Sequence, residues 1–150
     1  MLMTALIAFA ATIQAPVAPV PAAPFVPDPA LYAVRYPFDA VEGVAFLEHP
    51  AVRAAVRRAV RDPAIRNWIL EPGDSPSPKM YRSDGVLIAA GCQFHACNAR
   101  SWAILFDPVR QTARVCYHDG APHWFAADGR REKTTENCPY GAVPILPGPN

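Results

Sequence analysis

VLIAAGCQFHACNARSWAILFDP, residues 86–108, consists of two apolar runs on either side of a short loop that contains Cys92, His95 and Cys97. Each run is apolar throughout, which is typical of a strand at the centre of a sheet, and an Asp-Pro pair ends the second run. The connection is shorter than the dozen or more residues that a parallel return needs, so the two strands should be antiparallel neighbours. We therefore expect this hairpin to form the centre of the sheet.

Further strand patterns lie on both sides of the central hairpin. Residues 79–83 are joined to the first central strand by Asp84-Gly85, which is a strong signal for a two-residue turn. Residues 113–118 and 123–127 give two more short strands between turn residues. Because all the connections are tight, we expect a meander of about five antiparallel strands.

Two helices are predicted ahead of the strands. In residues 48–62, valines recur at four-residue steps and give the segment one apolar face. Asp62 and Pro63 suit the N-cap and the first position of a second, shorter helix with Trp68 on its apolar side. We therefore expect an α+β fold, in which an antiparallel sheet of about five strands has helices packed on it.

The N-terminal region should lie outside this domain. Residues 1–15 contain an apolar run that is too short to span a bilayer and has the size of a secretory signal peptide. An N-terminal core helix or a retained anchor are the alternatives. Residues 16–30 hold six prolines, so we expect a Pro-rich linker there and a domain over residues 31–150 with an irregular C-terminal tail. After removal of the signal peptide, no stable membrane insertion is expected.

Charge and motifs argue against several classes of function. The net charge is +1, from 14 basic and 13 acidic residues, so no nucleic-acid partner is expected. Arg53, Arg57 and Arg61 form a basic stripe on the first helix, and a solvated outer face is the simpler interpretation than a site for an anionic partner.

The chain also lacks the common signatures of catalysis. It contains no Gly-x-Ser-x-Gly elbow and no phosphate-binding glycine loop. The carboxylates that could act as an acid-base pair lie in turns or charged segments, where solvated side chains are the simpler interpretation: Asp119, Asp128, Glu132 and Glu136. We therefore expect a protein that is not an enzyme and has no cofactor.

The four cysteines are the clearest chemical feature. An even number of cysteines after a signal peptide favours disulfides in an oxidising compartment. Three pairings are possible, and the simplest joins Cys92 to Cys97 and Cys116 to Cys138. The chain-entropy model gives about 2 kcal/mol for the small ring and about 3.4 kcal/mol for the larger loop. The small ring would thus contribute modest stability but would stiffen one loop strongly.

Metal and redox sites are the alternatives for the same cysteines. Zinc would take Cys92, His95 and Cys97 with one further ligand from His118, His123 or Cys116, but the C-x2-C spacing of zinc knuckles is missing. A redox pair would need the C-x-x-C spacing, which is also missing. We expect no metal. The remaining interpretations are a stiff loop that presents His95 to a partner and a structural loop with an incidental histidine.

The loop and its flanking strands resemble those of the Ivy family, inhibitors of vertebrate lysozyme, which are periplasmic proteins of Gram-negative bacteria. The resemblance covers most of the mature chain, from the first predicted helix to the fifth strand. In that family the loop usually reads Cys-Lys-Pro-His-Asp-Cys and lies between two apolar strands. Cys92, His95 and Cys97 occupy the matching places in this chain.

The resemblance implies a periplasmic inhibitor whose loop enters the lysozyme cleft, where the histidine hydrogen-bonds the catalytic carboxylates. His95 would then be the inhibitory residue, braced by Cys92 and Cys97, with Gln93, Phe94 and Ala96 as the other target-binding residues. These three stand where the family has Lys, Pro and Asp, although Phe94 offers an aromatic contact instead. Lysozyme, a lysozyme-like muramidase or one of the cell's own lytic transglycosylases is the expected target. A non-inhibitory envelope binding or assembly protein is the alternative from another class.

Overall fold

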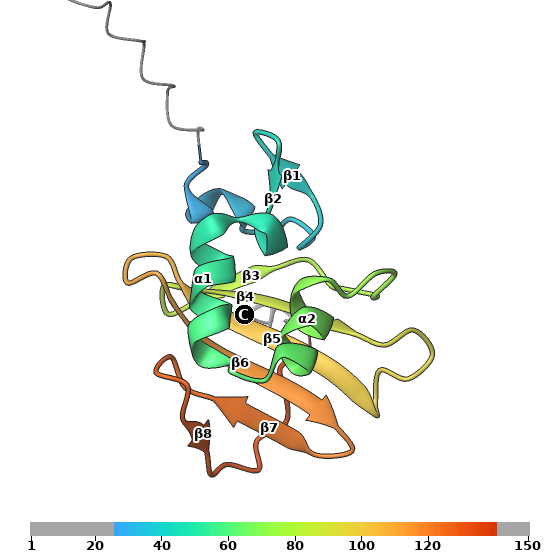
Figure 1. The fold of residues 1–150 in the computed structure, drawn as a ribbon. Coiled ribbons are helices and arrows are strands. Elements are labelled where there is room, and N and C mark those ends of the chain that lie inside the picture. The colour runs from blue at the N-terminus through green and yellow to red at the C-terminus, as the bar shows by residue number, and fades with distance from the viewer. Residues whose placement is uncertain (1–25, 141–150) are drawn as a thin grey trace, which may run out of the picture.

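The computed structural model describes residues 26–140. The signal peptide expected at residues 1–15, most of the expected linker and the end of the C-terminal tail lie outside this range. Two helices pack on one face of an antiparallel six-stranded sheet, and a small two-stranded hairpin lies beside it (Figure 1). The α+β prediction is confirmed. Within the described residues, no helix is long and apolar enough to cross a membrane.

The elements follow one another with short connections. The helical elements are η1 (Pro29–Tyr32), η2 (Phe46–Glu48), α1 (Pro50–Ala59) and α2 (Pro63–Leu70). The strands of the main sheet, in both chain and spatial order, are β3 (Tyr81–Ser83), β4 (Val86–Cys92), β5 (Arg100–Asp107), β6 (Thr112–Asp119), β7 (Pro122–Phe125) and β8 (Arg131–Glu132). The separate hairpin consists of β1 (Ala40–Val41) and β2 (Val44–Ala45). The sequence prediction of a meander is confirmed, but it missed β8 and this hairpin.

The register of β4 and β5 assigns their side chains to two faces. Leu87 pairs with Phe106, and both belong to the main core with the helices. The Ala90–Ala103 pair, three positions further along the ladder, belongs to a smaller cluster on the other face. Both faces are apolar because both are covered, which explains why the two runs lack the alternation of a half-exposed strand.

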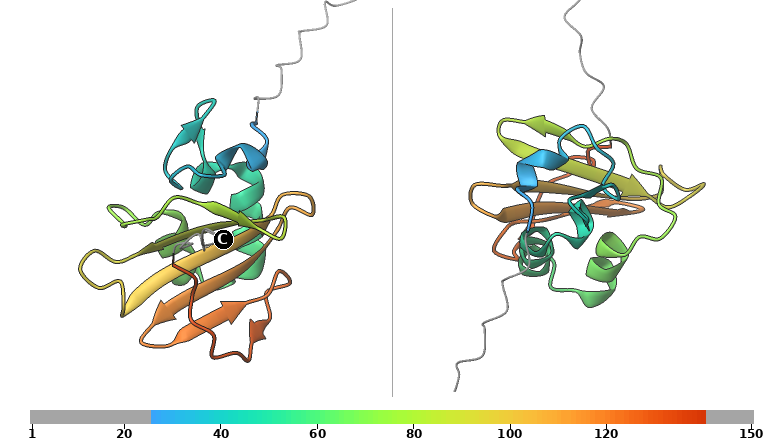
Figure 2. Two further views of the ribbon diagram at one scale, coloured as in Figure 1. Left: turned by 180° about the vertical axis from the view of Figure 1, so that it is seen from behind. Right: turned by 90° about the horizontal axis from the view of Figure 1, so that it is seen from above.

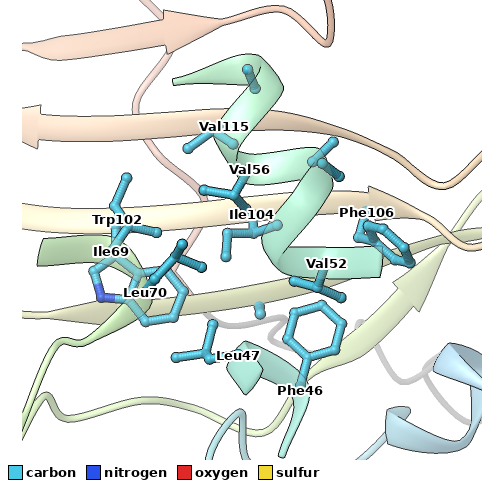
Figure 3. Packing of buried hydrophobic residues seen from close by; sticks show 14 of the residues in the cluster. Phe46, Leu47, Val52, Val56, Ile69, Leu70, Trp102, Ile104, Phe106 and Val115 are labelled. Atoms are coloured by element: carbon cyan, nitrogen blue, oxygen red, sulfur yellow. The ribbon is translucent and has the colours of Figure 1, made fainter. Parts of the chain in front are cut away.

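The main core lies between the helices and the sheet (Figure 3). Val52 and Val56 of α1 are fully buried, as their four-residue spacing predicts. They pack with side chains of α2, η2 and the central strands: Phe46, Leu47, Ile69, Leu70, Trp102, Ile104, Phe106 and Val115. Each large apolar side chain buried in this way contributes about 1.5–3 kcal/mol.

Side-chain caps begin both α-helices. The Asp62 carboxylate accepts a hydrogen bond of 2.8 Å from the Ala64 amide, as predicted for an N-cap. His49 caps α1: its Nδ1 accepts from the Ala51 amide at 3.1 Å, and its Nε2 lies 2.9 Å from the Pro27 carbonyl oxygen. The buried His49 therefore ties the start of α1 to a proline that we expected in the linker, so ordered structure begins inside the 16–30 stretch.

The arginines of the expected basic stripe bind largely within the chain. Arg53 forms an ion pair of 3.1 Å with Glu71, and Arg61 donates to the Asp128 carbonyl oxygen at 3.3 Å. Arg57 is exposed. These contacts join α1 to its surroundings and agree with a solvated face better than with a binding site for an anionic partner.

The segment after β8, residues 133–140, crosses the second face of the sheet (Figure 2). Cys138 forms a disulfide with Cys116 of β6, and the Trp124 indole donates to the Glu136 carbonyl oxygen at 2.8 Å. The guanidinium of Arg114 lies 3.9 Å from the centre of the Trp124 ring. This irregular C-terminal segment, which we call the strap, thus closes the second, smaller core.

Candidate functional site

The loop between β4 and β5 projects from one end of the sheet (Figures 1 and 2). Cys92, the last residue of β4, forms a disulfide with Cys97, and their Cα atoms are 4.8 Å apart. Backbone hydrogen bonds close the loop: the Gln93 amide donates to the Arg100 carbonyl at 2.9 Å, and the Arg100 amide donates to the Ala96 carbonyl at 2.8 Å. We call residues 92–97 the stapled loop.

The base of the stapled loop is fixed by a close contact inside the sheet. A Cβ atom added at Gly91 would lie 2.6 Å from the Trp102 ring and 2.7 Å from the Ser75 hydroxyl oxygen, so only glycine fits there. The Ser75 hydroxyl donates to the Cys92 carbonyl at 2.7 Å, and the Cys92 amide donates to the Pro76 carbonyl at 3.1 Å. The segment before β3 therefore holds the end of β4 in place.

The tip of the stapled loop presents two aromatic side chains. His95 is exposed and adopts a left-handed backbone conformation, with φ of 62°. Phe94 is 61% exposed, and its ring packs edge to face against the His95 imidazole, with centroids 4.0 Å apart. The His95 ring makes no hydrogen bond with any described residue, so both of its nitrogens can bind a partner.

The predicted site residues therefore lie together in one turn. Gln93, Phe94 and His95 are exposed, while Ala96 is half-buried. The Ala96 backbone closes the turn, because its amide donates to the Gln93 carbonyl at 2.9 Å and its carbonyl accepts from Arg100. Side chains at 93, 94 and 95 are thus available to a partner, whereas Ala96 mainly shapes the turn.

The cysteines form Cys92–Cys97 and Cys116–Cys138, and no described cysteine is free. Their sulfurs are consequently not available as thiolate ligands, which removes the zinc set considered from the sequence. Within residues 26–140, no group of three or more His, Cys, Asp or Glu side chains is placed to hold a metal ion.

The carboxylates considered for acid-base chemistry have structural partners instead. The Arg114 guanidinium contacts Glu132 at 2.6 Å and Glu136 at 3.8 Å. Asp128 pairs with Arg130 at 2.6 Å, and hydrogen bonds from this arginine lower the pKa of the Asp128 carboxyl. The two Arg114 contacts hold β8 and the strap against the sheet, and the Asp128–Arg130 pair lies within the β7–β8 turn.

A second group of polar residues lies beside the stapled loop; Asp119 and His123 were considered singly from the sequence, but Arg100 and Tyr117 were missed. Arg100, directly after the loop, lies over the Trp68 ring with its guanidinium carbon 4.7 Å from the ring centre. The Tyr117 hydroxyl donates to the Asp119 carboxylate at 3.0 Å, and burial raises the pKa of this phenol. Burial lowers the pKa of His123, which stacks on Tyr117. The signal in the sequence that could have pointed to this group is Arg100, a charged residue between the cysteine loop and an apolar strand.

Comparison with known protein families identifies the family of this chain. The family model described as Inhibitor of vertebrate lysozyme (Ivy) matches residues 51–139. The chain belongs to the Ivy family. No curated protein and no solved structure matches it.

The Ivy match covers the parts of the chain that build the candidate site. It includes nearly all of α1, all of α2, the six strands of the main sheet, the stapled loop and Cys138. The β1–β2 hairpin precedes it. Ivy proteins are inhibitors rather than enzymes, so lysozyme binding is the activity that family membership assigns to this chain.

Proposed function

We propose that this Ivy-family protein is a periplasmic inhibitor that inserts its stapled loop into the active-site cleft of a lysozyme-like glycosidase and binds the catalytic carboxyl groups through His95. The observation that carries this proposal is the exposed, unpartnered His95 imidazole at the tip of a loop closed by a disulfide. A loop that is already ordered loses less conformational entropy on binding than a flexible one.

The chemistry of the imidazole fits such a cleft. Retaining glycosidases hold two carboxyl groups about 5–5.5 Å apart, one protonated as the general acid and the other ionised. A neutral imidazole has one N–H donor and one acceptor nitrogen on opposite sides of its ring. His95 can therefore donate to the ionised carboxylate and accept from the protonated acid at the same time.

Phe94 supplies the apolar part of the proposed contact. Its ring packs against His95 and is 61% exposed, so the two rings enter a cleft as one unit. Buried aromatic anchors commonly dominate binding energy at protein interfaces. The tip carries no full charge on Gln93, Phe94 or Ala96, so shape and apolar contact, rather than ion pairs, would select the target. Lytic transglycosylases, which open the same glycan, are tested beside vertebrate lysozyme for this reason.

Two features of the chain support the proposed periplasmic location. The apolar run within residues 1–15 has the size of a secretory signal peptide, and disulfides persist in oxidising compartments such as the periplasm. Both favour an extracytoplasmic protein that meets lysozymes at the cell wall. Mass analysis of the N-terminus of protein prepared from the envelope tests this part of the proposal, and an unprocessed chain would contradict it.

The mechanism is tested by measuring cell-wall lysis by vertebrate lysozyme and by a lytic transglycosylase with and without the purified protein. His95→Ala removes one hydrogen bond to an ionised carboxylate, worth about 1.5–3 kcal/mol, and one to a neutral carboxylic acid, worth about 0.5–1.5 kcal/mol, so inhibition should weaken by at least about 30-fold. Phe94→Ala should weaken inhibition to a smaller extent.

Val109→Ala is the matched control for Phe94→Ala. Val109 is 92% exposed and lies in the β5–β6 turn, at the opposite end of the strands from the stapled loop. This variant should inhibit as the unaltered protein does. If His95→Ala keeps its fold and an unchanged inhibition constant, the proposed mechanism is wrong.

A further inference from the structure

A pocket lies where the strap meets the base of the stapled loop, on the face of the sheet opposite the helices. Its volume is about 360 Å³, within the range of about 300–1,000 Å³ typical of small-molecule sites. The polar side chains that line it come from the loop, the two central strands β5 and β6, and the strap: Asn98, Ser101, His118, Asn137 and Tyr140. Segments far apart in the sequence thus form one polar site.

The lining is polar without ion pairs. No Asp, Glu, Lys or Arg is among the described residues that line the pocket. The Asn98 and Asn137 carboxamides each offer donors and an acceptor. His118 Nδ1 lies 3.0 Å from the Ala99 carbonyl oxygen, which can only accept, so Nδ1 carries a hydrogen and Nε2 is left for a ligand. Such alternating donors and acceptors match a ligand rich in hydroxyl and amide groups.

Two further residues point to an uncharged ligand with an apolar side. Ser101 is 7% exposed, and its hydroxyl makes no hydrogen bond with another described residue; the hydroxyl oxygen is not among the described side-chain atoms that are buried without a partner, so it is open to the pocket. This hydroxyl is therefore free to donate or accept a hydrogen bond with a ligand in the pocket. Tyr140 donates its hydroxyl to the Pro76 carbonyl at 3.3 Å, which fixes a ring that remains 44% exposed. Sugars present hydroxyl groups at their edges and C–H groups on their faces, so they fit this pair.

Both disulfides hold the walls of the pocket. Cys97 and Cys138 line it, and each is covalently bound to a strand of the sheet, through Cys92 of β4 and Cys116 of β6. The loop wall and the strap wall are therefore fixed relative to the sheet before any ligand arrives. A fixed site loses little conformational entropy on binding, which favours a small ligand that makes few contacts.

We infer that this pocket binds a neutral sugar, an N-acetylated hexosamine of a glycan strand. Among the described residues of the lining, no lysine or arginine is placed to hold an anion, and no carboxylate is placed to hold a metal or an amine. The choice of an acetamido sugar over other neutral sugars rests on the proposed function, since a loop that enters a peptidoglycan-cleaving cleft brings the pocket close to that glycan. Binding to a neutral sugar itself does not depend on the loop mechanism.

The test is a titration of the isolated, isotope-labelled protein with tri-N-acetylchitotriose, followed by backbone amide NMR, with cellotriose as the sugar that lacks acetamido groups. Shifts should concentrate at residues 97–101, 118 and 137–140, and cellotriose should bind more weakly. Asn98→Ala combined with Asn137→Ala should raise the Kd for tri-N-acetylchitotriose by about tenfold, the equivalent of about 1.4 kcal/mol.

Asn67→Ala is the matched control, because Asn67 is an exposed asparagine on α2 and is not part of the pocket. It should bind the sugar as the unaltered protein does, and so should His95→Ala, which separates this inference from the loop mechanism. Absence of sugar binding, or shifts confined to other surfaces, would overturn the inference. A third outcome would also overturn it: the unaltered protein binds no sugar, but the double variant loses lysozyme inhibition. In that case the pocket would contact the enzyme rather than a sugar.

Discussion

Removal of the small disulfide should separate inhibition from stability. In the variant Cys92→Ala/Cys97→Ala the stapled loop loses its covalent brace but keeps its backbone hydrogen bonds, from Ala96 to Gln93 at 2.9 Å and from Arg100 to Ala96 at 2.8 Å. The loop should therefore become more mobile without unfolding the sheet beneath it. We expect this variant to inhibit lysozyme more weakly while its core stays intact.

The size of the effect follows from the ring. The disulfide closes a ring of six residues, for which the chain-entropy model gives about 2 kcal/mol. Without the disulfide, binding must order a more mobile loop. Because the backbone hydrogen bonds still restrict that loop, about 2 kcal/mol is the upper limit of the added free-energy cost. The inhibition constant should thus rise by up to about 30-fold, and the free energy of unfolding should fall by no more than about 2 kcal/mol.

The larger disulfide provides the comparison. Cys116→Ala/Cys138→Ala opens a loop of about 23 residues and should lower the free energy of unfolding by about 3.4 kcal/mol, yet it leaves the Cys92–Cys97 brace in place. Urea unfolding and inhibition of vertebrate lysozyme, measured well below the melting temperature, give both quantities for each variant. If the two variants lose inhibition in proportion to their loss of stability, the brace has no specific role and the reasoning fails.

Two further predictions concern the two ends of the central strands. Gly91→Ala forces a Cβ to within 2.6 Å of the Trp102 ring and should lower the free energy of unfolding by about 1–3 kcal/mol, measured in urea; an unchanged midpoint would contradict the close contact. The Arg110 amide hydrogen-bonds the Asp107 carboxylate and lowers the pKa of this carboxyl below its usual 3.8. The contribution of the ionised Asp107 carboxylate to folding stability is therefore complete above pH 3.8 and is lost as the pH falls through the lower pKa of the folded state. An asparagine side chain cannot ionise, so Asp107→Asn should show a smaller drop in urea midpoint between pH 5 and pH 2 than the unaltered protein.

The sequence predicts the centre of the fold because several local signals agree there. The runs 86–91 and 101–106 are apolar on both faces, and the Asp84-Gly85 turn has the two positive φ values, 49° and 82°, that this dipeptide favours. Valine spacing and the Asp62 cap place the helices to within a few residues. At these positions the local preference and the tertiary structure require the same conformation.

The missed elements depend on contacts that local patterns do not carry. Strand β8 consists of Arg131 and Glu132, which have no apolar pattern, and it forms because β7 offers a free edge and Arg114 binds Glu132. The β1–β2 hairpin turns at Glu42-Gly43, with φ values of 50° and 85°, although Glu is not a typical residue for this turn. Its strands of two residues are too short to give a periodic signal.

The stapled loop and the polar pocket also differ in how far they can be predicted from the sequence. The stapled loop is contiguous, so its residues could be singled out from spacing and resemblance alone. The polar pocket joins Asn98 to Asn137 across 39 positions of sequence, and only the sheet register and the Cys116–Cys138 bond bring them together. No local pattern connects two exposed asparagines in different loops.

The position of the stapled loop has a consequence for how the family can diversify. Gln93, Phe94 and His95 extend from two central strands whose register is set by six residue pairs and a buried core, and their side chains contribute little to that core. Substitutions at the tip should therefore carry a small stability penalty compared with changes in the strands. Under the proposed mechanism, new target enzymes would be acquired, by natural selection or by protein engineering, through exchange of a few tip residues on an unchanged scaffold.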